Sequence, residues 1–361
     1  MKKAIITTTI SFFLILAILS VAFICYDISQ PVFTIMCISD LHNQQNILEN
    51  GSIRGTITDT CKKALSEEKK VDVVLIGGDV TSNTKVKKDK VDAVLSNIVK
   101  AISPLTDNIL WVAGNHDFNA GEDDGYESAQ YYDFYMKDNV GNLSNDDRYF
   151  EEWNGNKNLL AYHYEINGFD FVAISTKHET MDGDLESYNY TYTEGAIEWV
   201  DKKLSQLGND KTVFVFGHFP FRDSKSLSKP EKGMLEECDK NFKEVLAKYP
   251  NVIYLYGHDH GTDSAYIRKD TAQRVTEYMS DGKVKGKHSA TATPSFISAF
   301  MGSMRYYSNS IDGNVGPSNS KVVQSLLIYV YRDKIVLQMK NYGIENGGRQ
   351  LLKPYVIKFD N

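Results

Sequence analysis

Five short apolar runs in this sequence each end in a cluster of Gly, Asp, Asn or His. Between several of them lie helical patterns, at about residues 56–69, 86–102, 194–207 and 232–248. Alternating strands and helices predict an α/β fold with a largely parallel, buried sheet. Because ligands bind beyond the carboxyl ends of the strands in such sheets, the five clusters are expected to meet at one edge. The runs and their clusters are 32–39 with Asp40-Leu41-His42, 71–76 with Gly77-Gly78-Asp79, 109–113 with Gly114-Asn115-His116-Asp117, 212–216 with Gly217-His218-Phe219-Pro220, and 252–256 with Gly257-His258-Asp259-His260.

The clusters are rich in side chains that bind metals. Neutral imidazole, carboxylate and amide oxygen are ligands of Mn, Fe, Co and Zn. Asp40 and His42 lie two residues apart, as do His258 and His260, and positions i and i+2 of an extended segment point to the same side. One cluster alone has an ordinary explanation, such as a helix cap or a packed histidine, but the ordered set predicts a metal site. The side chains concerned are Asp40, His42, Asp79, Asn115, His116, His218, His258 and His260.

The remaining sequence adds two hairpins and no second domain. Asn167-Gly168 separates the apolar stretches 159–166 and 169–175, which predicts antiparallel strands joined by a tight turn. Arg332-Asp333 separates two further stretches in the same way near the carboxyl end. Residues 118–158 are rich in Asp, Asn, Gly and Tyr and are expected to form an excursion over the site. No repeat or Pro/Ser-rich linker divides the chain, so one catalytic domain is expected over residues 31–361.

An apolar run over residues 4–25 follows Lys2 and Lys3 at the start of the sequence. It is long enough to span a bilayer as a helix. The two lysines before it, and the lack of Lys or Arg after it until Arg54, predict the amino end inside and the body outside the cytoplasmic membrane. Residues 1–30 are therefore expected to be a membrane-targeting helix, either an uncleaved signal-anchor or a cleaved signal peptide. The body is expected to be extracytoplasmic, either tethered to the cell membrane by a single pass or secreted.

The charge balance bears on the partners of the protein. The chain has 40 Lys+Arg against 47 Asp+Glu, for a formal net charge of -7. This argues against a general nucleic-acid-binding surface. It leaves room for a local phosphate site, because a bound metal supplies positive charge. No pattern in the sequence indicates an oligomeric state.

The ordered set of clusters resembles the calcineurin-like metallophosphoesterase family over residues 37–260. The resemblance implies a four-layer α/β/β/α sandwich with a binuclear metal centre and a phosphate monoester or diester as substrate. The cofactors that it implies are two divalent or trivalent ions drawn from Mn, Fe, Zn and Co. By position, one metal would be held by Asp40, His42, Asp79 and His260, and the other by Asp79, Asn115, His218 and His258, with Asp79 bridging.

The resemblance also implies a mechanism. A hydroxide activated by both metals attacks the phosphorus atom in line, and no covalent phospho-enzyme is needed. His116 matches the catalytic histidine of the family, which lies beside the metals without ligating them. It is expected to act as the general acid that protonates the leaving oxygen.

Two positions depart from several branches of the family. Those branches carry an aspartate three residues after the bridging ligand, which orients the catalytic histidine, and then an arginine, which binds phosphate. Ser82 and Asn83 stand at these positions here. Since Ser82 has no carboxylate, the dyad with His116 is either absent or rebuilt with Asp117, which makes Asp117 a candidate catalytic residue.

Two arginines are candidate phosphate contacts, with a plain surface charge as the alternative for each. They are Arg222, four residues after His218, and Arg305. The alternative for the whole protein is a non-catalytic metal- or phosphate-ligand-binding protein anchored at the cell surface. Such a protein usually shows lost ligands, and all seven candidate ligands are retained in this sequence.

Overall fold

The computed structural model describes residues 29–41, 65–66, 68–80, 88–117, 143–153, 156–176, 191–223, 234, 236–258, 267–270, 274–278, 284–289, 296–304, 323–342, 350–351 and 353–359. Within these ranges, no helix is both long and apolar enough to cross a membrane. The predicted membrane-targeting helix at residues 1–30 lies outside them, apart from its last two residues.

A smaller, mixed sheet contains the first three predicted strands. These pair in parallel, while the predicted carboxyl-terminal hairpin joins the edge of β1 in antiparallel register, with Phe33 opposite Val330. In spatial order the strands are β15 (Gln350–Leu351), β14 (Lys334–Asn341), β13 (Gln324–Val330), β1 (Phe33–Ile38), β2 (Val73–Ile76) and β3 (Ile109–Trp111), with β16 (Tyr355–Lys358) also paired to β14.

A larger sheet contains the other two predicted strands and the predicted hairpin around Asn167. Its central strands β6, β7, β8 and β12 are parallel, and the flanking pairs are antiparallel. In spatial order the strands are β11 (Val284–Ser289), β10 (Arg274–Tyr278), β9 (Ile267–Asp270), β12 (Ile297–Phe300), β8 (Val252–Tyr256), β7 (Val213–Phe216), β6 (Phe169–Ile174), β5 (Asn156–Ile166) and β4 (Arg148–Trp153).

The five predicted runs are all strands, and their division between two sheets agrees with the sandwich that the family resemblance implies. The single, largely parallel sheet predicted from the alternation of strands and helices is wrong. β1, β2 and β3 belong to one mixed sheet, and β7 and β8 belong to another. A buried apolar run specifies a strand without specifying its neighbours, which long-range packing decides. The expected excursion at residues 118–158 is wrong in its last part, because β4 and the start of β5 are strands of the larger sheet.

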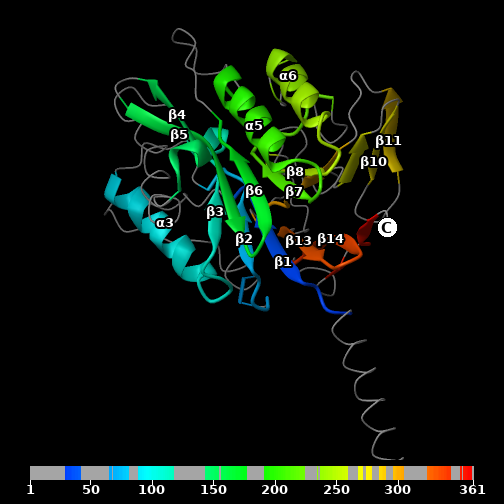
Figure 1. Cartoon of the computed structure of the whole chain (residues 1–361). Coiled ribbons are helices and arrows are strands. Elements are labelled where there is room, and N and C mark those ends of the chain that lie inside the picture. Colours follow the sequence, from blue (N-terminus) through cyan, green and yellow to red (C-terminus); the bar gives the residue numbers. More distant parts are fainter. Residues whose placement is uncertain are drawn as a thin grey trace, which may run out of the picture.

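In the described part of the chain, the helices α3 (Lys88–Ile102), α5 (Glu194–Leu207) and α6 (Glu236–Leu246) flank the sheets (Figure 1). Helix α5 begins at the cap Thr193, whose side-chain oxygen accepts a hydrogen bond from the amide of Ala196, and α5 packs beside α6 and over β5 and β6. Helix α3 lies beside the smaller sheet (Figure 1). Each of the three lies within a predicted helical range. The fourth, at 56–69, falls mostly outside the described residues. Short 3-10 helices are η1 (Asn115–Asp117) and η2 (Asn145–Asp147).

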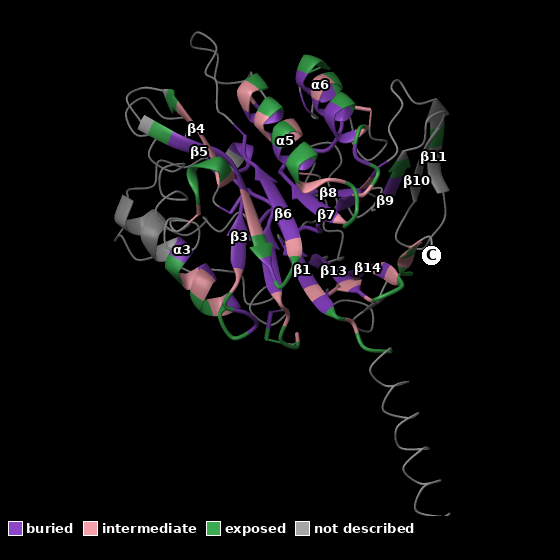
Figure 2. Ribbon diagram, viewed as in Figure 1, coloured by how far each residue is buried: buried purple, intermediate pink, exposed green. Residues whose placement is uncertain are grey.

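The two sheets pack face to face around one apolar core, so most of their strand residues are buried (Figure 2). Phe33 of β1 packs on Phe169 of β6 with ring centroids 4.4 Å apart. The hydroxyl of Tyr162 on β5 donates to the carbonyl of Trp111 on β3 at 2.8 Å and accepts from its amide at 2.9 Å. These polar bonds satisfy buried backbone groups and fix β3 of the smaller sheet against the larger one.

Candidate metal centre

The carboxyl ends of strands from both sheets meet at one place. The amide of Asp40, after β1, donates to the carbonyl of Gly78, after β2, at 3.0 Å. In the larger sheet, the amide of Gly257, after β8, donates to the carbonyl of His218, after β7, at 3.0 Å. The two sheets are joined here because the ring of His218 bonds to the carbonyl of Gly77. The expectation that the polar clusters meet at one edge is confirmed for these described segments.

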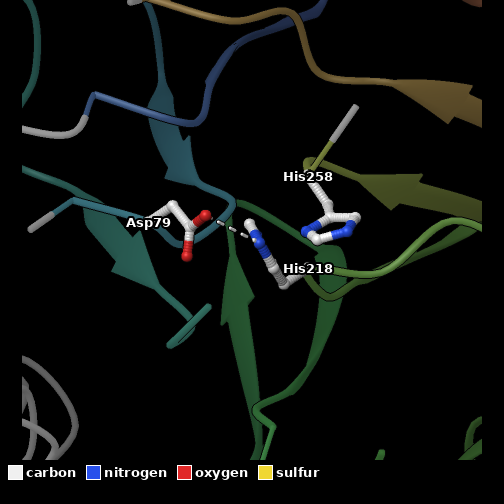
Figure 3. Close-up of side chains that lie close together, drawn as sticks. All are labelled: Asp79, His218 and His258. Carbon is white, nitrogen blue, oxygen red and sulfur yellow. Dashed lines mark ion pairs between the residues drawn. The ribbon is translucent and has the colours of Figure 1, made fainter. Parts of the chain in front are cut away.

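Asp79, His218 and His258 form a compact group of potential metal ligands (Figure 3). One ligand atom from each lies within 4.8 Å of the others. His218 Nε2 is 3.3 Å from Asp79 Oδ2. The side-chain oxygen of Asn115 is 3.1 Å from His218 Nε2 and 3.0 Å from His258 Nδ1. These are the four side chains that the family resemblance assigns to one metal, and they lie together.

The orientation of His218 is set by the backbone of the other sheet. Its Nδ1 is 2.6 Å from the carbonyl of Gly77, which only an N–H donor on Nδ1 can satisfy. Nε2 then faces Asp79 and Asn115, as a metal ligand would. Burial alone would lower the pKa of His218, but the nearby carboxylates of Asp79 and Asp40 and the Gly77 carbonyl raise the pKa to about 9. A cation bound here would displace that proton.

Unusual backbone angles concentrate at the proposed ligands. Among the described residues, four that are not glycine have positive φ: Asp40 at 53°, Asp79 at 52°, His258 at 67° and Asn167 at 52°. Asn167 belongs to the tight hairpin, where such angles are ordinary. The other three are proposed ligands, and each left-handed angle costs about 1–3 kcal/mol. Strain at these three positions, held by the surrounding packing, is typical of a functional site.

Glycine is required where the loops after β2 and β3 touch. Gly78 has φ 91°, and a Cβ there would stand 2.6 Å from the amide nitrogen of Gly114. A Cβ at Gly114 would in turn collide with the carboxylate of Asp79. These two glycines allow Asp79 to approach the loop that carries Asn115.

Asp40 ties β1 to the loop after β8. Its carboxylate accepts the amide hydrogen of His258, with N···O distances of 3.2 and 3.1 Å. Asp40 and Asp79 are both fully buried. Both carboxylates act on His218 and raise its pKa, and buried carboxylates are costly unless positive charge compensates them. His42 and His260, the other predicted ligands of that metal, lie outside the described residues.

Asp117 lies behind the site rather than at its surface. It is fully buried, and its Oδ2 accepts hydrogen bonds from the amides of Asp79 and Gly114, both at 2.8 Å. It therefore holds the two loops that carry Asp79 and Asn115. The structure describes only the backbone of His116, in η1, so the prediction that Asp117 orients this histidine stays a prediction.

Sequence analysis missed a pair of tyrosines that supports His218. The Tyr192 hydroxyl accepts the amide hydrogens of His218 at 2.9 Å and Phe219 at 3.1 Å. It lies 2.9 Å from the hydroxyl of Tyr254, which donates to the carbonyl of Phe219 at 2.8 Å. Both tyrosines are buried, and burial raises the pKa of each. No spacing in the sequence marks them, because their partners are backbone atoms.

Of the two candidate phosphate contacts, the structure describes Arg222 but not Arg305. Arg222 is half-buried, and its backbone amide donates to Asp239 Oδ1 at 2.6 Å, which fixes the chain after His218. The next residue, Asp223, pairs with the buried Arg268 at 2.6 Å. Arg305 lies outside the described residues.

The donor set fits a borderline divalent metal. One carboxylate, two imidazoles and an amide oxygen converge, and a cation among them would compensate the buried carboxylates. Such mixed oxygen and nitrogen sets suit Mn, Fe, Co and Zn. Both the types of donor atom and their closeness in space are therefore suited to a bound divalent metal.

The chain belongs to the calcineurin-like phosphoesterase family, whose model matches residues 33–262. This family uses divalent metals, and its chemistry is metal-dependent hydrolysis of phosphoesters. No curated protein matches the chain in sequence.

Solved structures resemble this one at low sequence identity. A dimetal phosphatase from Danio rerio aligns with a TM-score of 0.55 at 17% identity, over 92% of this chain and 100% of that chain. Vps29 from Entamoeba histolytica complexed with Zn²⁺ aligns with a TM-score of 0.33 at 12% identity, over 91% and 99%. A hypothetical protein from Thermus thermophilus gives 0.37 at 13%, over 90% and 99%. The likeness to the dimetal phosphatase shows a shared fold.

Proposed function

We propose that this protein hydrolyses phosphate monoesters or diesters at a two-metal centre bridged by Asp79. The observation that carries the proposal is the convergence of Asp79, His218 and His258, with one ligand atom from each inside 4.8 Å. Asn115 completes one ligand set, and the position of Asp40 beside His258 supports a second. Family membership supports the reaction class.

The second ligand set is proposed from position in the sequence. It consists of Asp40 and Asp79, together with His42 and His260. The complete fold proposed with it is the four-layer α/β/β/α sandwich of the family, formed by one domain over residues 31–361.

The chain's own residues have distinct tasks in the proposed reaction. Bound cations supply Lewis-acid activation of the phosphate ester and of the attacking water. The carbonyl of Gly77 keeps His218 Nε2 directed at the centre. Asp117 holds the amides of Asp79 and Gly114, so that the bridging carboxylate keeps its place. His116, next to Asn115, donates a proton to the leaving oxygen.

Substrate contacts and location complete the proposal. Arg222 and Arg305 are proposed to bind the phosphate oxygens that face away from the metals. Residues 1–30 are proposed to carry the body to the outer side of the cytoplasmic membrane, where residues 4–25 anchor it. A reporter fused after residue 60 should be active only outside the cytoplasm, and activity inside would overturn this location.

The reaction class is tested with one phosphomonoester, p-nitrophenyl phosphate, and one phosphodiester, bis-p-nitrophenyl phosphate. The purified full chain is assayed with Mn²⁺, after chelation, and after Mn²⁺ is restored. The proposal expects turnover of at least one ester, loss on chelation and recovery with metal. A folded protein that binds metal and turns over no ester, across a wider panel of phosphate esters, would support a non-catalytic binding protein instead.

A further inference from the structure

A cavity of about 720 Å³ opens at the end of the sheets opposite the metal centre. It is lined by residues at the amino ends of strands β6, β7 and β8, including Phe169, Thr212 and Val252. The proposed ligands follow the carboxyl ends of β7 and β8. The length of the strands therefore separates this cavity from the metal centre, and it is a different site.

The cavity combines apolar and cationic side chains. Ile335 and Ile357 contribute to its apolar lining. Its charged lining residues are three cations, Lys211, Arg332 and Lys358, and one anion, Asp210. All three cationic residues are exposed. A lining with a formal charge of about +2 on a chain of net charge -7 favours an anionic, partly apolar partner.

The same end of the molecule carries unusually exposed apolar side chains. Val32 and Val356 are exposed to 45% and 44%, and they are the large apolar residues that stand out as exposed in the described part of the chain. Val32 lines the cavity, and Val356 precedes the lining residue Ile357 on β16. Exposed apolar groups next to cations are typical of surfaces that rest on a bilayer.

The sequence places this end next to the proposed anchor. Seven residues separate Cys25, the last residue of the apolar run, from Phe33 at the start of β1. An extended chain spans at most about 3.5 Å per residue, so an anchor that ends at Cys25 would place the start of β1 within roughly 30 Å of the bilayer surface. Val32, which lines the cavity, lies even nearer along the chain.

We propose that this cavity is the membrane-facing surface of the protein and binds the anionic headgroups of phospholipids in the bilayer that holds residues 4–25. The phosphate groups pair with Lys211, Arg332 and Lys358, and the exposed valines contact the interface. The inference rests on the anchoring part of the proposed function and is independent of hydrolysis. It directs the metal centre away from the membrane.

The test uses the full chain reconstituted in vesicles of phosphatidylcholine alone or of phosphatidylcholine with phosphatidylglycerol. Hydrogen exchange is followed in residues 209–212 and in β16, which both contribute to the cavity. Exchange in these segments should be slower with phosphatidylglycerol, and the difference should shrink as salt is raised. Removing one cation should weaken docking about fivefold, and the triple variant Lys211→Glu, Arg332→Glu, Lys358→Glu should abolish the lipid difference.

The control variant is Lys157→Glu, Lys202→Glu, Lys240→Glu, which reverses three lysines outside the cavity. It has the same charge as the test variant and should keep the lipid difference. Equal exchange in the two lipids for the wild type, or an unchanged difference in the test variant, would overturn the inference. Slowing by inorganic phosphate in detergent micelles would overturn it in favour of a soluble anion. Hydrolysis of a soluble ester should be the same in both variants, which separates failure here from failure of the proposed function.

Discussion

The carboxylate of Asp117 accepts a 2.8 Å hydrogen bond from the backbone amide of Asp79, the residue whose own carboxylate faces His218. A second bond of 2.8 Å, from the amide of Gly114, ends on the same oxygen. One buried oxygen thus joins the loops after β2 and β3. It also supports the left-handed backbone at Asp79, where φ is 52°.

Asp117→Leu is expected to lower both stability and metal affinity. The change leaves the amides of Asp79 and Gly114 buried without their acceptor, at a cost of about 2–4 kcal/mol in the free energy of unfolding. Asp117→Asn keeps a side-chain oxygen and should lose less. Urea unfolding with and without chelator measures both effects. A Leu variant with wild-type stability and metal content would show that the two bonds are unimportant.

Tyr192→Phe should weaken metal binding without unfolding the protein. The change removes the acceptor of the His218 and Phe219 amides, and loss of such outer partners typically lowers metal affinity about 10–100-fold. Activity should return in part at high metal concentration, which a purely structural defect would not do. Tyr249→Phe is the control, since its hydroxyl bonds to Asp201 instead. Equal metal affinities in the two variants would contradict the assignment.

Much of the fold could be predicted because its central strands are continuous apolar runs ended by glycine or aspartate. Strands such as β10 and β11 could not be recognised as continuous apolar runs, because charged residues interrupt them, as in Val284–Ser289. The division into two sheets depends on which strands pair, for example β1 with β13, nearly three hundred residues away. Local sequence carries no information on that choice.

The proposed ligands could be picked out from the sequence because metal binding demands particular side-chain types. Asp40, Asp79, Asn115, His218 and His258 all lie where strands end, as expected. The supporting contacts could not be predicted, although the sequence already makes Asp117 a candidate as the partner of His116. Tyr192 and Asp117 act on backbone amides, and those partners have no residue type to recognise.

His163 should make the stability of the protein depend on pH. Burial alone would lower the pKa of His163, but hydrogen bonds to Asp170 at 2.8 Å and Asp147 at 3.0 Å raise it above the ordinary 6.5. The charged ring therefore stabilises the fold fully below pH 6.5, and this contribution is lost as pH rises through the folded pKa.

The measurement for His163 is the free energy of unfolding of wild type and His163→Gln across pH. The difference between the two proteins should be largest below pH 6.5 and should shrink as pH rises. Tyr164→Phe, at the neighbouring position of β5, should give a difference that does not vary with pH. A His163→Gln difference that is equally flat would contradict the raised pKa.

His116→Asn should separate proton transfer from metal binding. Metal content should stay near that of the wild type, because Asn115 rather than His116 is the proposed ligand. Turnover should fall by roughly 10²–10⁴-fold, the usual contribution of a positioned general acid. Alkyl esters should suffer more than p-nitrophenyl esters, whose leaving group departs without a proton. Loss of metal, or equal slowing of both ester classes, would contradict the general-acid role.

The most direct test of the whole account is the metal content of the Asp79→Asn variant, measured by elemental analysis together with turnover. Asp79 is buried, contacts His218 and is proposed to serve both cations. The wild type should hold two metals per chain, and the variant should lose occupancy at both sites and lose turnover while remaining folded by circular dichroism. His218→Ala, in comparison, should empty mainly one site. Two fully occupied metals in the Asp79 variant would contradict the bridged centre on which the proposed function stands.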